Sequence, residues 1–160
     1  MSVALFKTAT KTVMDAVVGV DSARVYKAQR LLESDKLASD IMLNGETTVN
    51  TWFMSCVGFD DGMKSIGGGG FNMRTYRMEL IGYYTIDDST DPTSEEVYET
   101  LCETISDAIA ANIRAELPAS SHILDCPSFE IGYAVLPSIG GILVHRARAS
   151  FTANLWHQRG

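Results

Sequence analysis

Residues 142–157 read ILVHRARASFTANLWH, and this stretch indicates the kind of fold to expect. Apolar side chains occupy every second position from Ala147 to Leu155, and mostly polar ones, among them Arg146 and Arg148, lie between them. Because successive side chains of a strand point to opposite faces, this alternation is typical of a long strand with one buried face. The sequence therefore predicts a sheet whose apolar face is covered by other elements.

Three further stretches have strand character. Residues 71–86 alternate apolar with polar or charged side chains around Met78, and residues 129–136 are bounded by prolines. Residues 49–57 carry no charge and include Trp52 and Phe53. Such a composition is typical of a strand that is buried on both faces or lies at a subunit contact.

The clearest helix signal covers residues 93–117. Thr93 and Glu96 have the spacing of a capping box, and Pro118 ends the pattern. Apolar residues recur at helical spacing and predict a core-facing stripe, which comprises Val97, Leu101, Ile105, Ala108, Ile109, Ile113 and Leu117.

A second helix is predicted for residues 3–18, with Gly19 as its stop. Residues 23–32 and 36–43 give no clear pattern. Taken together, the elements predict one domain over residues 1–160 of the α+β class. We expect a two-layer arrangement in which a mostly antiparallel sheet has two helices packed on one face and leaves the other face polar.

Residues 58–70 contain six glycines and predict a flexible Gly-rich loop. Its Lys64-Ser65 pair resembles the end of a phosphate-binding loop. However, only three residues separate Gly58 from Gly62, and Met63 stands before the lysine, so the spacing differs from that of a P-loop. We therefore expect no nucleotide cofactor.

The charge is unevenly distributed. The chain has 13 Lys and Arg against 20 Asp and Glu, which gives a net charge of −7. Residues 87–116 hold nine acidic residues and a single base, Arg114, so this segment carries −8 and the remainder +1. An acidic chain is a poor general nucleic-acid binder, because that affinity comes mainly from Lys and Arg neutralising phosphates.

The sequence offers no catalytic or metal-binding constellation. The histidines lack metal-ligand spacing, the three cysteines contain no CxxC pair, and the Asp-rich turn at 87–91 lacks the order of an EF-hand. The residues concerned are His122, His145, His157, Cys56, Cys102 and Cys126. We expect no enzymatic activity, no cofactor and no metal, and we expect the thiols to be buried and free.

No membrane segment is predicted. The longest stretch without charge or histidine is 131–144, which has 14 residues and contains Pro137. The first residues lack the pattern of an export signal, so we expect the chain to fold in the cytoplasm.

Four arginines form the most informative polar set. Arg77, Arg146 and Arg148 are predicted to project from the polar face of the sheet, where Glu79 and Glu130 are available partners, and Arg74 lies near them in the sequence. One interpretation is a salt-bridged solvent face. The other is a subunit interface, or a surface that meets DNA or a charged ring, where forked guanidinium groups are favoured.

The order of these elements resembles the tail terminator proteins of long-tailed bacteriophages, also called tail completion or neck proteins. The resemblance rests on Tyr76-Arg-Met-Glu-Leu-Ile-Gly-Tyr-Tyr84, on the helix start Thr93-Ser-Glu-Glu and on Leu143-Val-His-Arg-Ala-Arg-Ala-Ser-Phe-Thr152, and it is best over residues 70–157.

This resemblance implies a virion protein with a fold similar to tail-tube proteins. It would form a homohexameric ring on the end of the tail tube and would bind the head-tail connector or stopper protein, with DNA passing through the channel without sequence-specific binding. The residues expected at the assembly interfaces are Arg74, Arg77, Arg146, Arg148, Trp52, Phe53, Gly67, Gly68, Gly69 and Gly70.

Two alternatives remain open at this point. The chain could instead be the head-completion adaptor or stopper protein of the neck. It could also be a small-molecule-binding or enzymatic α+β domain with a cleft near Cys56 or His145.

Overall fold

The computed structural model describes residues 3–28, 40–43, 48–66, 69–87, 89, 92–116, 121–123, 127–136 and 141–158. In chain order its elements are α1 (Val3–Asp15), the short 3-10 helix η1 (Ser22–Arg24), β1 (Val25–Tyr26), β2 (Asn50–Ile66), β3 (Gly69–Thr85), α3 (Ser94–Glu116), β4 (Ser121–Ile123), β5 (Ser128–Leu136) and β6 (Ile142–Gln158).

The strands form one mixed sheet in the order β1-β2-β3-β6, and both β4 and β5 pair with the far side of β6. Because β4 pairs near Ala153 and β5 pairs between Ile142 and Ser150, the sheet is five strands wide. The pairing of β1 with β2 is parallel, and the other pairings are antiparallel. The predicted α+β class with a mostly antiparallel sheet is confirmed.

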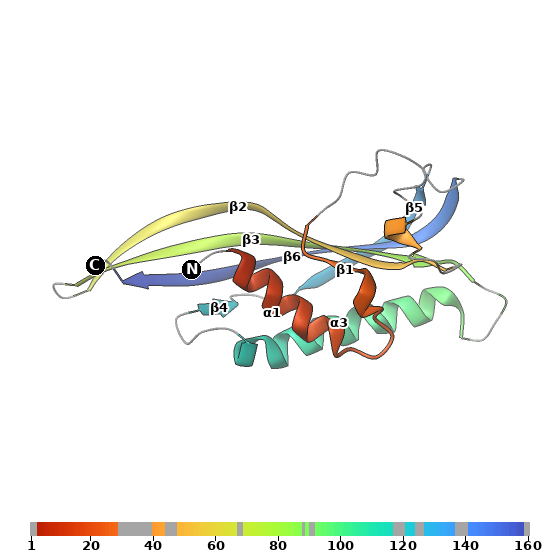
Figure 1. Ribbon diagram of the computed structural model, residues 1–160, viewed down its shortest axis with the longest axis horizontal. Helices are drawn as coiled ribbons and strands as arrows, with labels where there is room; N and C mark the ends of the chain where they lie inside the picture. Colours follow the sequence, from red (N-terminus) through yellow and green to blue (C-terminus); the bar gives the residue numbers. More distant parts are fainter. Residues whose placement is uncertain are drawn as a thin grey trace.

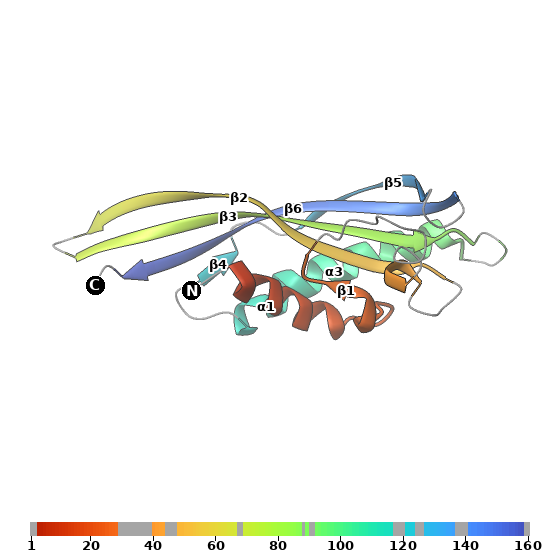
Figure 2. The ribbon, with the colours of Figure 1, turned by 45° about the horizontal axis from the view of Figure 1, so that its top comes forward.

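Both long helices lie on the same face of the sheet, side by side (Figures 1 and 2). Phe6 of α1 and Tyr98 of α3 are fully buried against Trp52, Leu80 and Phe151 of the three central strands. Burial of large apolar side chains is the main stabilising term in such a layer, at about 1.5–3 kcal/mol each. The predicted two-layer packing is therefore present, and this cluster is the main core.

The opposite face is less polar than predicted. At one end of the sheet, Ile41 and Met42 pack on Phe53 and Val144 and form a second apolar cluster. Buried Arg24 supports this segment, because its guanidinium donates hydrogen bonds to Asp21 and to the main-chain oxygens of Met42, Leu43 and Thr48. Residues 40–43 gave no clear pattern in the sequence because so short a segment has no room for periodicity.

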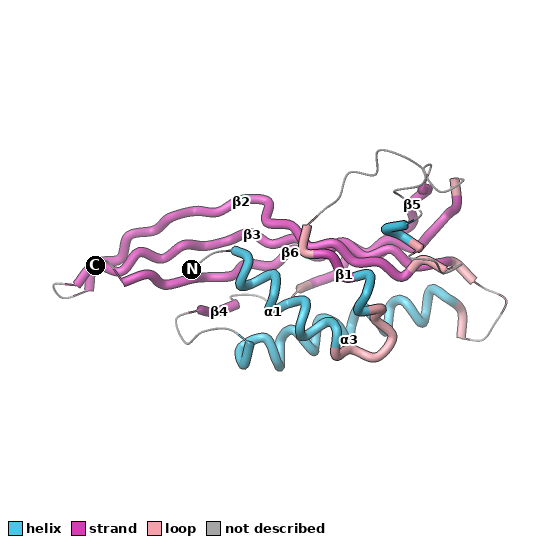
Figure 3. Tube along the Cα trace, in the orientation of Figure 1, coloured by secondary structure: helices cyan, strands magenta, loops and turns pink. Residues whose placement is uncertain are grey.

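The prediction of a flexible loop at 58–70 is wrong for most of that range. β2 continues to Ile66 and β3 begins at Gly69, so residues 58–66 and 69–70 belong to a long hairpin. The outer part of this hairpin, residues 60–66 and 69–75, is called the arm, and it projects past the ends of both helices (Figure 3). Within the range 58–70, Gly67 and Gly68 lie outside the described residues.

Cross-strand ion pairs link the two strands of the hairpin at the base of the arm. Asp61 accepts two hydrogen bonds from Arg74, at 2.5 and 2.8 Å, and Asp60 lies 3.5 Å from Arg77. Residues of low strand propensity are thus held by pairing and by charged neighbours. The Asp and Gly residues of this stretch are typical of a loop, and the local sequence does not show that β3 pairs with it.

The helix predictions hold with small changes at the ends. The capping box is present, since the Thr93 amide donates to the Glu96 carboxylate at 3.0 Å. Along α3, the predicted core residues Leu101, Ile105, Ile109 and Ile113 are buried, and Tyr98 and Cys102 widen the stripe. Val97 is 37% exposed and lies at the edge of the stripe, and Leu117 lies outside the described residues. α1 ends at Asp15, and Gly19 has the left-handed φ of +96° expected at a helix stop.

Candidate functional site

The predicted arginine set is divided between the two faces of the sheet. Arg77, Arg146 and Arg148 pair in register with Thr152, Tyr83 and Ile81, on the face that α1 and α3 leave uncovered. Arg74 points to the helix side, where it lies 4.7 Å above the ring of Phe59. The three arginines on the uncovered face thus form one surface, and Arg74 belongs to the arm.

Ion pairing accounts for much of this surface. Arg148 donates to Glu79, whose side chain is only 9% exposed, and Arg77 lies beside Asp60. Arg146 is exposed and has no ion pair among the described residues. It borders a shallow depression of about 260 Å³ opposite Gly132. The interpretation as a salt-bridged face therefore applies to Arg148, whereas Arg146 is available to contact a partner.

We expect Arg148→Ala to lower the free energy of unfolding by about 1–2 kcal/mol, because it leaves the nearly buried Glu79 carboxylate without its charged partner. Arg146→Ala is the matched control, for which we expect the free energy of unfolding to change by about 0.5 kcal/mol or less. Chemical denaturation of the two variants measures the difference between them. Equal losses in the two variants would contradict the structural role of Arg148.

Trp52 and Phe53, predicted at an interface, lie inside the protein. Trp52 is fully buried in the main core, and Phe53 is buried in the second cluster on the other face. Burial on both faces explains why residues 49–54 carry no charge. Gly69 and Gly70 pair with Ile66 and Ser65 at the start of β3.

Two edges of the sheet carry features that the sequence did not reveal. Within the described residues, β1 covers the outer edge of β2 only at Trp52 and Phe53, and no strand pairs with the rest of that edge. Val57, beside a register shift, and Phe59 are more than half exposed there. An open strand edge with apolar side chains is a template for pairing with another chain.

The opposite edge has the same character. β5 pairs only with β6 among the described strands. Tyr133 and Val135 are more than half exposed, Ile131 is 38% exposed, and Leu143 lies directly across from Val135. These side chains alternate along β5 with small or polar ones, so the strand itself was predictable. Their exposure was not, because the sequence does not show that β5 lies at an edge.

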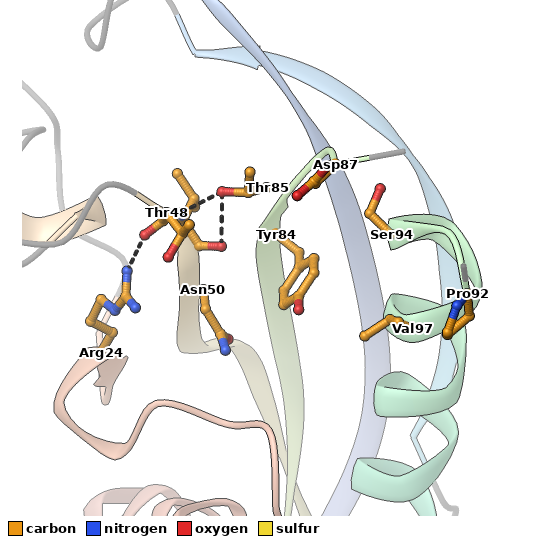
Figure 4. A pocket seen from close by; sticks show the side chains of 10 residues that line it. Arg24, Thr48, Asn50, Tyr84, Thr85, Asp87, Pro92, Ser94 and Val97 are labelled. Atoms are coloured by element: carbon orange, nitrogen blue, oxygen red, sulfur yellow. Dashed lines mark hydrogen bonds between the residues drawn. The ribbon is translucent and has the colours of Figure 1, made fainter. Parts of the chain in front are cut away.

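A pocket of about 260 Å³ opens where α3 begins (Figure 4). Its lining includes Arg24, Asn50, Asp87 and Ser94. The Ser94 hydroxyl lies 2.9 Å from Nε2 of buried His145, which ties the start of α3 to β6.

A Ser-His pair acts as a nucleophile when a third group orients the histidine. The His145 ring lies 5.8 and 5.2 Å from the rings of Tyr98 and Tyr133, between centroids, in addition to its hydrogen bond with Ser94. The Ser94–His145 hydrogen bond is buried and links the start of α3 to β6.

The described cysteines are free thiols, Cys102 buried and Cys56 half-buried, and Cys126 lies outside the described residues. Burial, with a smaller contribution from the charges of Glu99 and Glu103, raises the pKa of the Cys102 thiol to about 12. A thiol that keeps its proton at neutral pH is a poor nucleophile. Cys102 is therefore a core side chain.

The raised pKa of Cys102 makes stability fall in alkaline solution. The unfolded thiol loses its proton near the ordinary thiol pKa of 9.0, while the folded thiol keeps it to about pH 12. The stabilising contribution is thus complete below pH 9 and is lost as the pH rises toward 12, by up to about 1 kcal/mol per pH unit. We expect unfolding titrations between pH 8 and 10 to show a smaller slope for Cys102→Ala, and an unchanged slope would contradict this assignment.

In the part of the chain that the structure describes, no three His, Cys, Asp or Glu side chains gather as a metal site would require. The helices described are too short or too polar to cross a bilayer. The side chains of His122 and His157 lie outside the described set.

No protein-family model matches the chain, and no curated protein matches it. The resemblance to tail terminator proteins therefore rests on the quoted residues and on the order of the elements alone.

Proposed function

We propose that this protein is a structural virion protein, a phage tail terminator that forms a ring, caps the tail tube and joins it to the head-tail connector while leaving a DNA channel. The observation that carries the proposal is the pair of open sheet edges, β2 on one side and β5 on the other. Among the described residues, most of each edge has no neighbouring strand paired to it, and each edge carries large exposed apolar side chains.

The two open edges of the sheet differ from each other and lie on opposite sides of the subunit, which favours head-to-tail association of subunits. Such a contact is heterologous, and it closes into a ring when the rotation between neighbours is an exact fraction of a turn. Val57 and Phe59 on one edge, and Tyr133 and Val135 on the other, supply the apolar side chains that the centre of a stable interface needs. A small α+β subunit with these edges is suited to a ring.

The remaining surfaces fit the other contacts of a terminator. The arm extends beyond the helices and offers a long hairpin to the tube end or to a neighbouring subunit (Figure 1). The uncovered face carries Arg77, Arg146 and Arg148, of which two are neutralised by carboxylates. Such a surface tolerates passing DNA without holding it tightly, because few free charges remain to release counterions.

The direct test is the oligomeric state together with binding to tail tubes. Native mass spectrometry and electron microscopy should find rings, with hexamers expected, and purified tubes of the matching tail protein should be capped at one end. A chain that stays monomeric and leaves the tubes uncapped would overturn the proposal. Binding to the head-tail connector alone would instead support the adaptor or stopper protein of the neck.

A small-molecule-binding or enzymatic domain is the second candidate, favoured by the pocket beside Ser94 and His145. A small-molecule screen read by thermal unfolding tests it. Stabilisation of a strictly monomeric wild-type chain, lost when Asp87 or Asn50 in the pocket lining is replaced by Ala, would support this candidate over the ring.

A further inference from the structure

The helix flank beside the open edge of β2 is basic. It holds Lys7 and Lys11 of α1 and Lys27, which directly follows β1. Lys27 Nζ lies 3.3 Å from the Thr8 hydroxyl, and Lys11 Nζ donates to the Ser22 main-chain oxygen at 2.8 Å. These contacts place Lys11 and Lys27 on the side of α1 that adjoins β1. Lys7 precedes Lys11 by four residues and so lies on the same face of the helix, next to the β2 edge.

The helix flank beside β5 is acidic. Glu95, Glu99 and Glu103 are exposed and follow one another at intervals of four residues, so they form a row of like charges on α3. Glu99 and Glu103 stand at the rim of a groove of about 600 Å³ between α3 and β5. Phe129 and Ile131 line this groove with apolar surface.

We infer that the α3–β5 groove of one subunit receives the β2 edge and basic α1 flank of the next subunit in the ring. This inference rests on the proposed function, because it requires a second copy of the chain. The two flanks lie on opposite edges of one sheet and cannot meet within a subunit. The chain itself thus offers a surface that fits the groove, namely an apolar strand edge accompanied by lysines.

Charge and apolar surface both favour the β2 edge of the next subunit as the partner that binds in the α3–β5 groove. On the helix side, the ring of Phe59 projects from β2, and Ile131 and Tyr133 project from β5. Lysines that approach from the neighbour would relieve the repulsion within the acidic row. The contact also accounts for the uneven charge of the sequence, in which the acids gather on one helix while the other helix bears lysines.

The test uses charge reversal with mixing. Variant A carries Glu99→Lys and Glu103→Lys, and variant B carries Lys7→Glu and Lys27→Glu. Lys11 is left unchanged because it also pairs with Asp15 at 2.9 Å. Each variant alone should self-associate about tenfold or more weakly than wild type, since like charges then face each other.

An equal mixture of the two variants should restore ring formation. In a ring that alternates A and B, each lysine-bearing groove meets a glutamate-bearing flank, and each unchanged groove meets an unchanged flank. Mass spectrometry of the mixture should therefore find mixed rings with equal numbers of A and B. Circular dichroism and denaturation of each variant check that the subunits are folded.

A single charge added elsewhere on the same helix serves as the control. Thr104 is exposed on α3, lies outside the acidic row and is not among the residues that line the groove, so Thr104→Lys should leave assembly unchanged where Glu103→Lys weakens it. Rings that form normally from A or B, or a mixture that stays dissociated, would overturn this contact and leave the proposed ring intact. A monomeric wild type would overturn the proposed function itself.

Discussion

Replacing Gly82 with alanine is expected to destabilise the protein by close to 3 kcal/mol, the upper end of the range for overpacked cores. Gly82 of β3 lies opposite Trp52 in the sheet. A Cβ atom at this position would stand 2.3, 2.5 and 2.6 Å from three ring carbons of that tryptophan. Trp52 is fully buried and contacts Tyr98 and Phe129, so it has little room to move.

The same substitution at Gly132 provides the control. Gly132 also lies within a strand, and a Cβ atom there would have no neighbour within 4 Å. We expect Gly132→Ala to change the free energy of unfolding by about 0.5 kcal/mol or less. Urea denaturation of the two variants gives the comparison.

A double-mutant cycle isolates the cause of the Gly82 effect. In a Trp52→Leu background the indole ring is gone, so Gly82→Ala should cost much less than in wild type. If the alanine costs as much in both backgrounds, the close approach to Trp52 is not the origin of the destabilisation. If Gly82→Ala and Gly132→Ala cost the same, backbone effects of glycine would explain both.

The elements with strong periodic signals were predictable from sequence. The alternation in 142–157 predicted β6, and the capping box placed the start of α3 within one residue. These signals are local, because side-chain period and cap geometry depend on neighbours in the chain. The packing of both helices on one face followed from the apolar stripes that the helices carry.

The parts that the sequence did not reveal depend on distant partners. Residues 58–66 lack apolar periodicity, and they form a strand because β3 pairs with them in register to Gly69. The segment at 40–43 is held by Arg24, which lies far from it in sequence. No local pattern records such long-range contacts.

The candidate surfaces were predicted in part. The alternation rule placed Arg77, Arg146 and Arg148 on one face, as the structure has them. It did not show that Glu79 holds Arg148, nor that the exposed apolar residues gather at the two edges. Which strands lie at the edge is a property of the strand order, and the strand order follows from the whole fold.

We expect Val135→Asp to prevent ring formation while leaving the subunit folded. Val135 is 58% exposed at the open edge of β5, so the folded monomer tolerates a charge there. In the proposed ring the same side chain lies in a contact with the neighbour's β2 edge, where an unpaired carboxylate would be desolvated. The substitution should weaken association about a hundredfold. The free-energy cost of burying one unpaired charge at an interface is large enough to cause this change.

Val18→Asp separates this effect from a general change in surface character. Val18 is 93% exposed, in the turn after α1, and it lies at neither open edge. Because both variants exchange one exposed valine for an aspartate, they change the net charge equally, and Val18→Asp removes at least as much exposed apolar surface. Analytical ultracentrifugation should therefore find monomers for Val135→Asp and rings for Val18→Asp. Rings from both variants would remove the β5 edge from the interface, and monomers from both would trace association to nonspecific hydrophobic contact.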